Sequence, residues 1–257
     1  MPVAEGVLKT DMALEPIYKP GRVDPAYHLR YSWTGWLREA IPPRAEILGR
    51  VKPLWEKDGL RLLEHRWAAE TVQLAFSALP QVSPVLLAGR AKGPLQYALR
   101  NAMPGFPGFK RKVAVRSVGE NTRAEIEAYI GRQVKKERFA DPRFEACMEQ
   151  FTVRCPDVDL SEPAESARGR YWYNLHVVIV VVERHRVLDQ RRLRIIRDGC
   201  FKVAAKKNYR IALESVMPDH VHLALRGEIE HSPYEIALAF QNNLAYLLGQ
   251  VRFWNEH

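Results

Sequence analysis

The sequence predicts an α+β protein built from two tandem halves, each a two-layer sandwich. The chain has 257 residues, enough for one large or two smaller domains. A shift of 149 positions aligns ten residues of a first copy, without a gap, with identical residues between 210 and 248; they are Arg61, Val72, Leu74, Ala75, Ser83, Pro84, Ala88, Leu95, Tyr97 and Leu99. Tyr27 and Leu29 match Tyr173 and Leu175 at a slightly different shift. A repeat of this kind indicates an internal duplication.

Each copy has the pattern strand, helix, strand, helix. In the first copy we expect strands over 27–36 and 60–77 and helices over 43–56 and 83–101. In the second copy we expect strands over 173–182 and 209–225, a helix over 191–206, and a last helix that begins at Ser232-Pro233. Helices interleaved with strands in this order predict ferredoxin-like halves, here joined as a pseudo-dimer.

The copies differ after their second helix. Copy one continues through a turn rich in Gly and Pro, a basic strand over 109–118 and a helix over 122–138, whereas copy two shows no such helix before residue 257. We therefore expect an N-terminal extension (1–24), a first half (25–140), a linker without apolar periodicity (141–170) and a second half (171–257).

Composition narrows the function classes. Hydrophobic residues at 47% and charged residues at 27% predict a folded protein and argue against disorder. No apolar run approaches the ~20 residues of a membrane span, and no secretory signal is recognised. The three cysteines lack CxxC spacing, which fits a reducing compartment. We therefore expect a cytoplasmic, nucleoid-associated protein. Thirty-nine Lys and Arg against thirty Asp and Glu give a net charge of +9, which favours nucleic acid as partner, with anionic membrane second.

The sharpest local motif is His220-Val221-His222. On a strand, residues i and i+2 face the same side, so the two imidazoles are expected together, in a geometry that suits a divalent metal. Two polar side chains on an exposed strand face are the alternative, which the pattern alone leaves open.

The second motif is Tyr129 with Gln133 on the helix over 122–138. Residues four apart share a helical face, and Arg132, Lys135 and Lys136 make the surroundings cationic. A phenol becomes a useful nucleophile when nearby positive charge favours the phenolate and a metal polarises the attacked phosphate. A tyrosine at the edge of the core and a solvated glutamine are the alternative.

Together these motifs resemble a known family. The segment 217–225 resembles the His-hydrophobic-His motif of the single-tyrosine HUH transposases, the TnpA-like enzymes of small insertion sequences and their REP-associated relatives. The segment 113–119 followed by Tyr129 and Gln133 is similar to the strand and nucleophile helix of that family. The resemblance implies that His220, His222 and Gln133 bind Mg²⁺ or Mn²⁺. It also implies that Tyr129 attacks single-stranded DNA near a hairpin, leaving a 5′-phosphotyrosine and a free 3′-OH.

Neither half holds a complete set of these residues. Copy one has Thr71 and Gln73 where copy two has His220 and His222, and only copy one has the tyrosine helix. Because family dimers can place the tyrosine helix of one subunit against the histidines of the other, we expect the two halves to build one composite site. An inactive or domesticated protein that binds hairpin or single-stranded DNA is the alternative.

Other candidates are weaker. Basic residues that could contact phosphates are Lys110, Arg111, Lys112, Arg116, Arg132, Lys135, Lys136, Arg191 and Arg192, although such residues are more often simply solvated. Trp33, Trp36, Trp172 and Trp254 are expected in the core rather than stacked on bases. The remaining histidines are expected to have no partner at metal spacing: His28, His65, His176, His185, His231 and His257.

Overall fold

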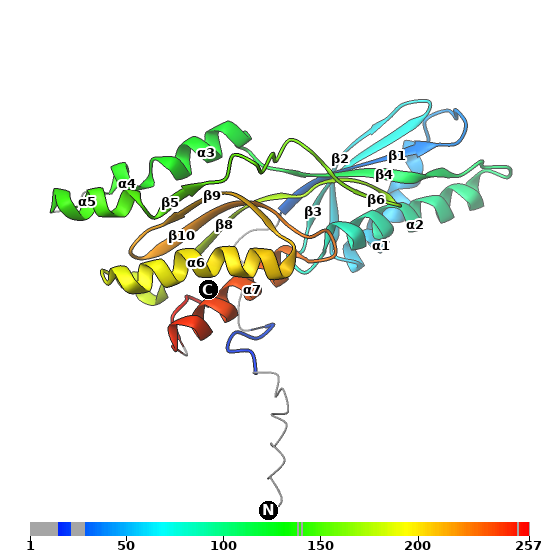
Figure 1. The fold of residues 1–257 in the computed structure, drawn as a ribbon. Helices are drawn as coiled ribbons and strands as arrows, with labels where there is room; N and C mark the ends of the chain where they lie inside the picture. Colours follow the sequence, from blue (N-terminus) through cyan, green and yellow to red (C-terminus); the bar gives the residue numbers. More distant parts are fainter. Residues whose placement is uncertain (1–14, 22–28, 138, 140, 251, 257) are drawn as a thin grey trace, which may run out of the picture.

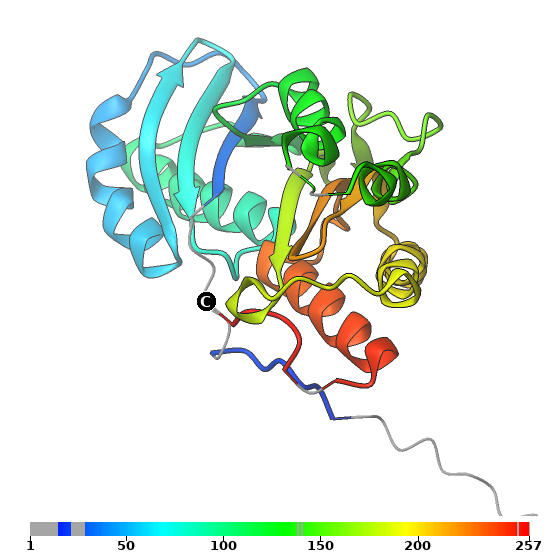
Figure 2. The ribbon, with the colours of Figure 1, turned by 90° about the vertical axis from the view of Figure 1, so that its left-hand side faces the viewer.

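A computed structural model describes residues 15–21, 29–137, 139, 141–250 and 252–256. The expected start of the first strand at Tyr27, together with His28 and His257, lies outside the described residues. The chain is an α+β protein with two sheets that lie side by side (Figures 1 and 2). In the described part, no helix is both long and apolar enough to cross a membrane.

The first half has the ferredoxin-like order. Its elements are β1 (Leu29–Leu37), the 3-10 helix η1 (Ala45–Ile47), α1 (Leu48–Lys57), β2 (Leu60–Trp67), β3 (Thr71–Ala78), α2 (Pro84–Ala102) and β4 (Phe109–Val118). The strands pair antiparallel in the order β2-β3-β1-β4. Helices α1 and α2 cover one face of this sheet, where Trp33, Trp55 and Phe76 are fully buried.

The second half repeats the plan. It consists of β8 (Asn174–Val180), the 3-10 helix η2 (Val182–Arg184), α6 (Gln190–Lys207), β9 (Arg210–Val216), β10 (His220–Arg226) and α7 (Pro233–Leu248). Its strands pair antiparallel, with β10 between β8 and β9. As predicted, Ser232 caps α7: its hydroxyl accepts from the Glu235 amide while the Glu235 carboxylate accepts from the Ser232 amide.

Two expectations about strands were too coarse. The segments 60–77 and 209–225 were each expected to form one strand, but each is a hairpin of two strands. The turns contain Ala69-Glu70 in the first hairpin and Pro218-Asp219 in the second. Proline lacks a backbone N–H and interrupts a strand ladder, a signal that the sequence did carry in the second hairpin.

The helix expected over 122–138 is broken in two. Helix α3 (Arg123–Gly131) begins at Thr122, which forms a capping box with Glu125, and α4 (Gln133–Lys136) follows after Arg132. Gly131 sits at the break, where its low helix propensity favours an ending.

The segment 141–170, expected to be a linker, contains regular structure. It forms α5 (Pro142–Glu149), β5 (Thr152–Arg154), β6 (Ala164–Ser166) and β7 (Gly169–Trp172). These elements are too short to produce a detectable hydrophobic period. Strand β5 extends the second sheet beside β9, and β7 extends the first sheet beside β4, so the segment belongs to both sheets.

The two sheets meet where β4, β7 and β8 come together. Strand β7 pairs parallel with β4, and only Tyr173 separates it from β8. The Ser117 hydroxyl on β4 bridges this junction by donating to the carbonyl of Asn174 at 2.8 Å and accepting from the Asn174 amide at 3.1 Å. The chain then continues from β4 into α3, which packs on β9 and β10 of the other half (Figure 1).

The described part of the N-terminal extension packs on the second half. The Tyr18 side chain is buried, and its hydroxyl accepts from the amides of Phe253 and Trp254. The Tyr18 amide donates to Asn242 on α7 at 2.7 Å.

Candidate active site

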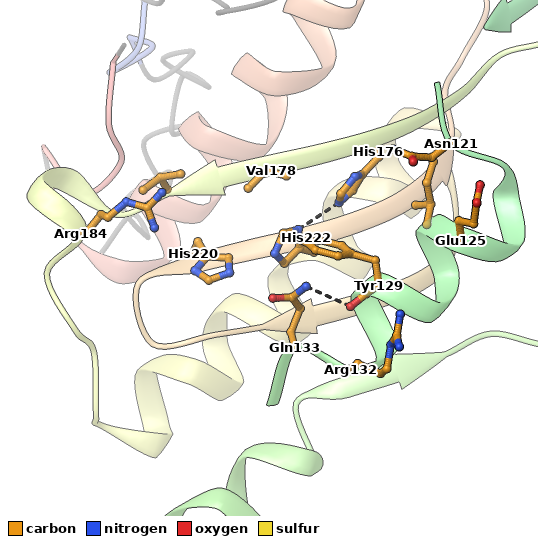
Figure 3. A pocket seen from close by; sticks show the side chains of 12 residues that line it. Asn121, Glu125, Tyr129, Arg132, Gln133, His176, Val178, Arg184, His220 and His222 are labelled. Atoms are coloured by element: carbon orange, nitrogen blue, oxygen red, sulfur yellow. Dashed lines mark hydrogen bonds between the residues drawn. The ribbon is translucent and has the colours of Figure 1, made fainter. Parts of the chain in front are cut away.

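A pocket of about 820 Å³ lies between the helices after β4 and the sheet of the second half (Figure 3). Its lining combines residues from both halves: Asn121, Glu125, Ile126, Tyr129, Arg132 and Gln133 from the first, and His176, Val178, Val180, Arg184, His220 and His222 from the second.

His220 and His222 project from the same face of β10 into this pocket, while Val221 points into the core. Their ring centroids are 4.7 Å apart. The Nδ1 atom of His220 lies 2.5 Å from Oδ1 of Asp219, so the carboxylate fixes the ring and leaves Nε2 free. Burial tends to raise the pKa of Asp219, but the hydrogen bond and charge of His220 and the bond from Arg184 outweigh it and lower that pKa.

His222 is almost fully buried and is held by a residue that sequence reasoning missed. Nε2 of His176 lies 3.0 Å from Nδ1 of His222, and the two rings stack. Burial lowers the pKa of His222 to about 3, and the positive charges of His220 and His176 act in the same direction. The imidazole of His222 is therefore neutral at physiological pH, which is the form that binds metals.

A usable signal for His176 was present in the fold prediction. In a ferredoxin-like sheet the first and third strands are neighbours, and here His176 on β8 pairs directly with Ala224 on β10. Residues paired across strands share a face, and Ala224 shares the face of His222, two residues earlier. The expectation that His176 has no such partner was wrong, because it was based only on the spacing of histidines along the chain.

Tyr129 and Gln133 reach the histidines from α3 and α4 of the first half. The Tyr129 ring lies edge to face against His222, with centroids 5.5 Å apart, and is 39% exposed. The Lys136 ammonium lies 4.2 Å from the centroid of that ring. The Gln133 side chain is buried, and its amide nitrogen donates to the Tyr129 carbonyl at 2.9 Å. The structure thus brings together Tyr129, Gln133, His220 and His222 (Figure 3).

The donor atoms in the pocket fit a divalent ion. Nε2 of His222 is buried without a hydrogen-bond partner in the structure, and such an unpaired buried polar atom is costly unless something binds it. Among the described residues, no three histidine, cysteine or acidic side chains form a metal cluster. The Gln133 amide lines the same pocket, and because its nitrogen donates to the Tyr129 carbonyl, its oxygen is the atom left to act as a further donor.

The other basic candidates lie in different places. Arg132 lines the pocket, and its Nε donates to the Ala128 carbonyl at 3.0 Å. Arg184, which sequence reasoning also missed, lines the pocket and pairs with Asp219 at 3.3 Å. Outside the pocket lining are Lys135 on α4, Lys110, Arg111, Lys112 and Arg116 on β4, and Arg191 and Arg192 at the start of α6.

The positions in the first half that match the histidines hold a different arrangement. Thr71 and Gln73 lie on β3, where the Gln73 amide donates to the Ser32 hydroxyl at 3.1 Å. These side chains belong to the first sheet, and none of them lines the pocket.

Comparison with known proteins gives a family match for the second half. Residues 170–254 match the family model described as "Transposase IS200 like", a stretch that contains His176, His220 and His222 but neither Tyr129 nor Gln133. Curated protein sequences give no match.

Two solved structures are similar to parts of the chain. One, from Deinococcus radiodurans, is assigned as a candidate transposase; it has 22% identity and a TM-score of 0.34 over 42% of this chain and 93% of that chain. The other is the regulatory subunit of aspartate kinase from Thermus thermophilus, with 9% identity and a TM-score of 0.21 over 85% of this chain and 99% of that chain. At these TM-scores, neither likeness bears on function.

Proposed function

We propose that the protein is a metal-dependent enzyme that nicks single-stranded DNA and transfers the strand, as a transposase does, with Tyr129 as the nucleophile. The observation that carries the proposal is the convergence of Tyr129 with His220 and His222 in one pocket, although they come from different halves of the chain. The match of residues 170–254 to the IS200-like transposase model supports DNA as the partner.

In the proposed reaction, the Tyr129 oxygen attacks a backbone phosphorus atom. A bond forms between the tyrosine oxygen and phosphorus, the bond to the 3′ oxygen breaks, and the products are a 5′-phosphotyrosine and a free 3′-OH. The phenol proton passes to solvent, to which the ring is partly open, and the departing 3′ oxygen takes up a proton from solvent to become the 3′-OH. The Lys136 ammonium, 4.2 Å from the ring centroid, adds positive charge beside the attacked phosphate. Strand transfer is the reverse attack by a 3′-OH on the phosphotyrosine.

The proposed cofactor is Mg²⁺ or Mn²⁺, held by His220, His222 and Gln133. When bound, the ion would polarise the attacked phosphate and offset its developing charge. Asp219 and His176 would orient the two imidazoles through their Nδ1 atoms, which leaves both Nε2 atoms for the ion. Arg132 and Arg184, which also line the pocket, would contact the phosphates on either side.

The test is adduct formation with labelled single-stranded hairpin DNA and Mn²⁺, read on a denaturing gel. Tyr129→Phe is expected to abolish the covalent adduct and to leave DNA binding intact. Tyr246→Phe, which alters an exposed tyrosine on α7, is the matched control and is expected to form the adduct.

Two results would count against the proposal. If Tyr129→Phe still formed the adduct, another residue would be the nucleophile. If the unaltered protein bound the hairpin but formed no adduct with either metal, the protein would be an inactive DNA-binding relative.

A further inference from the structure

One face of the first sheet is left uncovered in the described structure. Helices α1 and α2 lie on the opposite face, and α3 to α5 lie over the second half (Figure 1). Residues along each strand alternate between the buried and uncovered sides. We call the uncovered side the open face. By register its residues include Arg30, Ser32, Thr34 and Trp36 on β1, Arg61, Glu64 and Arg66 on β2, Gln73 and Ala75 on β3, Arg116 on β4, and Arg170 and Trp172 on β7, and Lys112 joins them by alternation with Ala114.

The strands of this sheet are strongly basic. The six strands carry eight Lys or Arg residues and two Glu residues. Arg30 pairs with Glu120 at 3.7 Å and Arg170 with Glu165 at 2.9 Å. Among the described residues, no carboxylate pairs with the side chains of Arg61, Arg66, Lys112 or Arg116, the other basic residues named on the open face.

The open face also offers a flat surface for stacking. Trp172, which was expected in the core, is only half-buried and lies on this face. The Arg116 guanidinium lies over its ring, 4.5 Å from the centroid. The Trp172 indole donates to the Ser161 carbonyl at 2.8 Å, which fixes the orientation of the ring. Small side chains such as Ser32, Thr34 and Ala75 lie between the charged ones, and Trp36 adds a second partly exposed indole at the far end of β1. Guanidinium and aromatic planes on such a surface are typical platforms for unpaired bases.

A second, smaller pocket lies between the end of β4 and the catalytic pocket. It has a volume of about 270 Å³ and begins at Ser117 and Val118, just beyond Arg116. Its lining includes Asn121, Ile126 and His176, which also line the catalytic pocket. The two pockets therefore adjoin, and the smaller one reaches the end of β4 next to Arg116.

We propose that the open face binds the single-stranded DNA that enters the catalytic pocket, with Lys112 and Arg116 contacting its phosphates. The proposal rests on the proposed function only for the identity of the strand at the pocket. Unpaired positive charge favours a polyanion over a protein partner, and the surface with its fixed planar groups favours unpaired bases over a duplex. The first half, which has Thr71 and Gln73 in place of the histidines, then works as the substrate-binding half.

The test compares two double variants that each remove two positive charges. One is Lys112→Ala with Arg116→Ala, on the open face. The other is Arg50→Ala with Lys52→Ala, exposed on α1 at the opposite face of the same sheet. Both are made in the Tyr129→Phe protein, so that binding is measured without cleavage. The probe is a fluorescently labelled oligothymidylate, titrated by anisotropy at several salt concentrations, and circular dichroism checks that each variant is folded.

We expect the open-face variant to bind roughly 20-fold more weakly at 0.1 M salt, because each phosphate contact on a single strand contributes about 0.7 to the slope of log K against log salt. The slope itself should become shallower by about 1.4. The α1 variant should keep the original affinity and slope. Equal losses in both variants, or no loss in either, would overturn the proposal.

Two further outcomes are informative. A dimer in solution that the open-face variant dissociates would assign this face to a second copy of the chain and would also overturn the proposal. If the open-face variant weakened binding as expected but the protein with Tyr129 formed no adduct, the DNA path would stand and the proposed catalytic function would fail.

Discussion

Glu214 is a buried carboxyl group behind the candidate active site, and it makes stability depend on pH. It lies on β9 with no exposed surface, and among the described residues the only polar group facing its carboxylate is the Cys200 thiol, a weak donor without hydrogen-bond geometry here. Burial raises its pKa from 4.5 to about 8, against the opposing effects of the Cys200 thiol and of the charge of Arg197. Glu214 is therefore protonated in the folded protein at neutral pH, whereas it is ionised in the unfolded chain.

The sign and size of the effect depend on this difference. Below the unfolded pKa both states hold the proton, so the ionisation of Glu214 does not change the free energy of unfolding. As pH rises from 4.5 toward 8, only the folded state keeps the proton, so the free energy of unfolding falls by about 1.4 kcal/mol per pH unit. Between pH 5 and 8 the loss is about 4 kcal/mol, and above the folded pKa no more is lost.

The perturbation is Glu214→Gln, which keeps the shape of the side chain and removes its titration. Urea unfolding is measured at pH 5, 6.5 and 8 for the unaltered protein, for this variant, and for Glu149→Gln on exposed α5 as control. The free energy of unfolding of Glu214→Gln, relative to the unaltered protein, is expected to rise by about 4 kcal/mol over this range. If the curves of the variant and the unaltered protein run parallel in pH, Glu214 ionises in the folded state as it does in water, and the reasoning is wrong.

Three further predictions concern the site and the junction between the halves. His176→Ala should weaken Mn²⁺ binding, measured by calorimetry, by about 10- to 100-fold because the ring of His222 loses its orienting partner, whereas exposed His185→Ala should not. Ser232→Ala should lower the free energy of unfolding by about 1 kcal/mol in urea, through loss of the α7 cap. Gly169→Ala should lower the free energy of unfolding by about 1–3 kcal/mol and speed proteolysis at the junction, because its Cβ would lie 2.3 Å from the Val113 carbonyl oxygen. Gly93→Ala on α2, where the added Cβ meets no other atom, should change neither.

Local patterns in the sequence predicted much of the fold. The basic strand over 109–118 has the predicted bounds, and the cap at Ser232 was readable from residue types alone. The sequence repeat aligned His220 and His222 with Thr71 and Gln73 of the first copy. Turns within 60–77 and 209–225 were missed because the apolar alternation continues across them. The strands within 141–170 were missed because three or four residues carry no measurable period.

The rest of the site depends on which strands are neighbours. His176 is 46 residues from His222 in the chain, and only the pairing of β8 with β10 makes them partners. The open face is similar: Arg116 and Trp172 are far apart in the chain and meet because β4 pairs with β7. To predict such contacts, one must know the order of the strands in the sheet as well as where each strand lies in the sequence.

The path of the chain explains how residues from both halves come to line one pocket. Strand β4 lies at the edge of the ferredoxin-like sheet that faces the second half, and β7 ties it to the start of β8. The helices after β4 are thereby carried across the junction onto β9 and β10, where Tyr129 meets His222. The distance between Tyr129 and the histidines is then set by the β4-β7-β8 junction, outside the pocket. A change at Gly169 or Ser117 should consequently alter adduct formation more than it alters metal binding, because the histidines and His176 all belong to the second sheet.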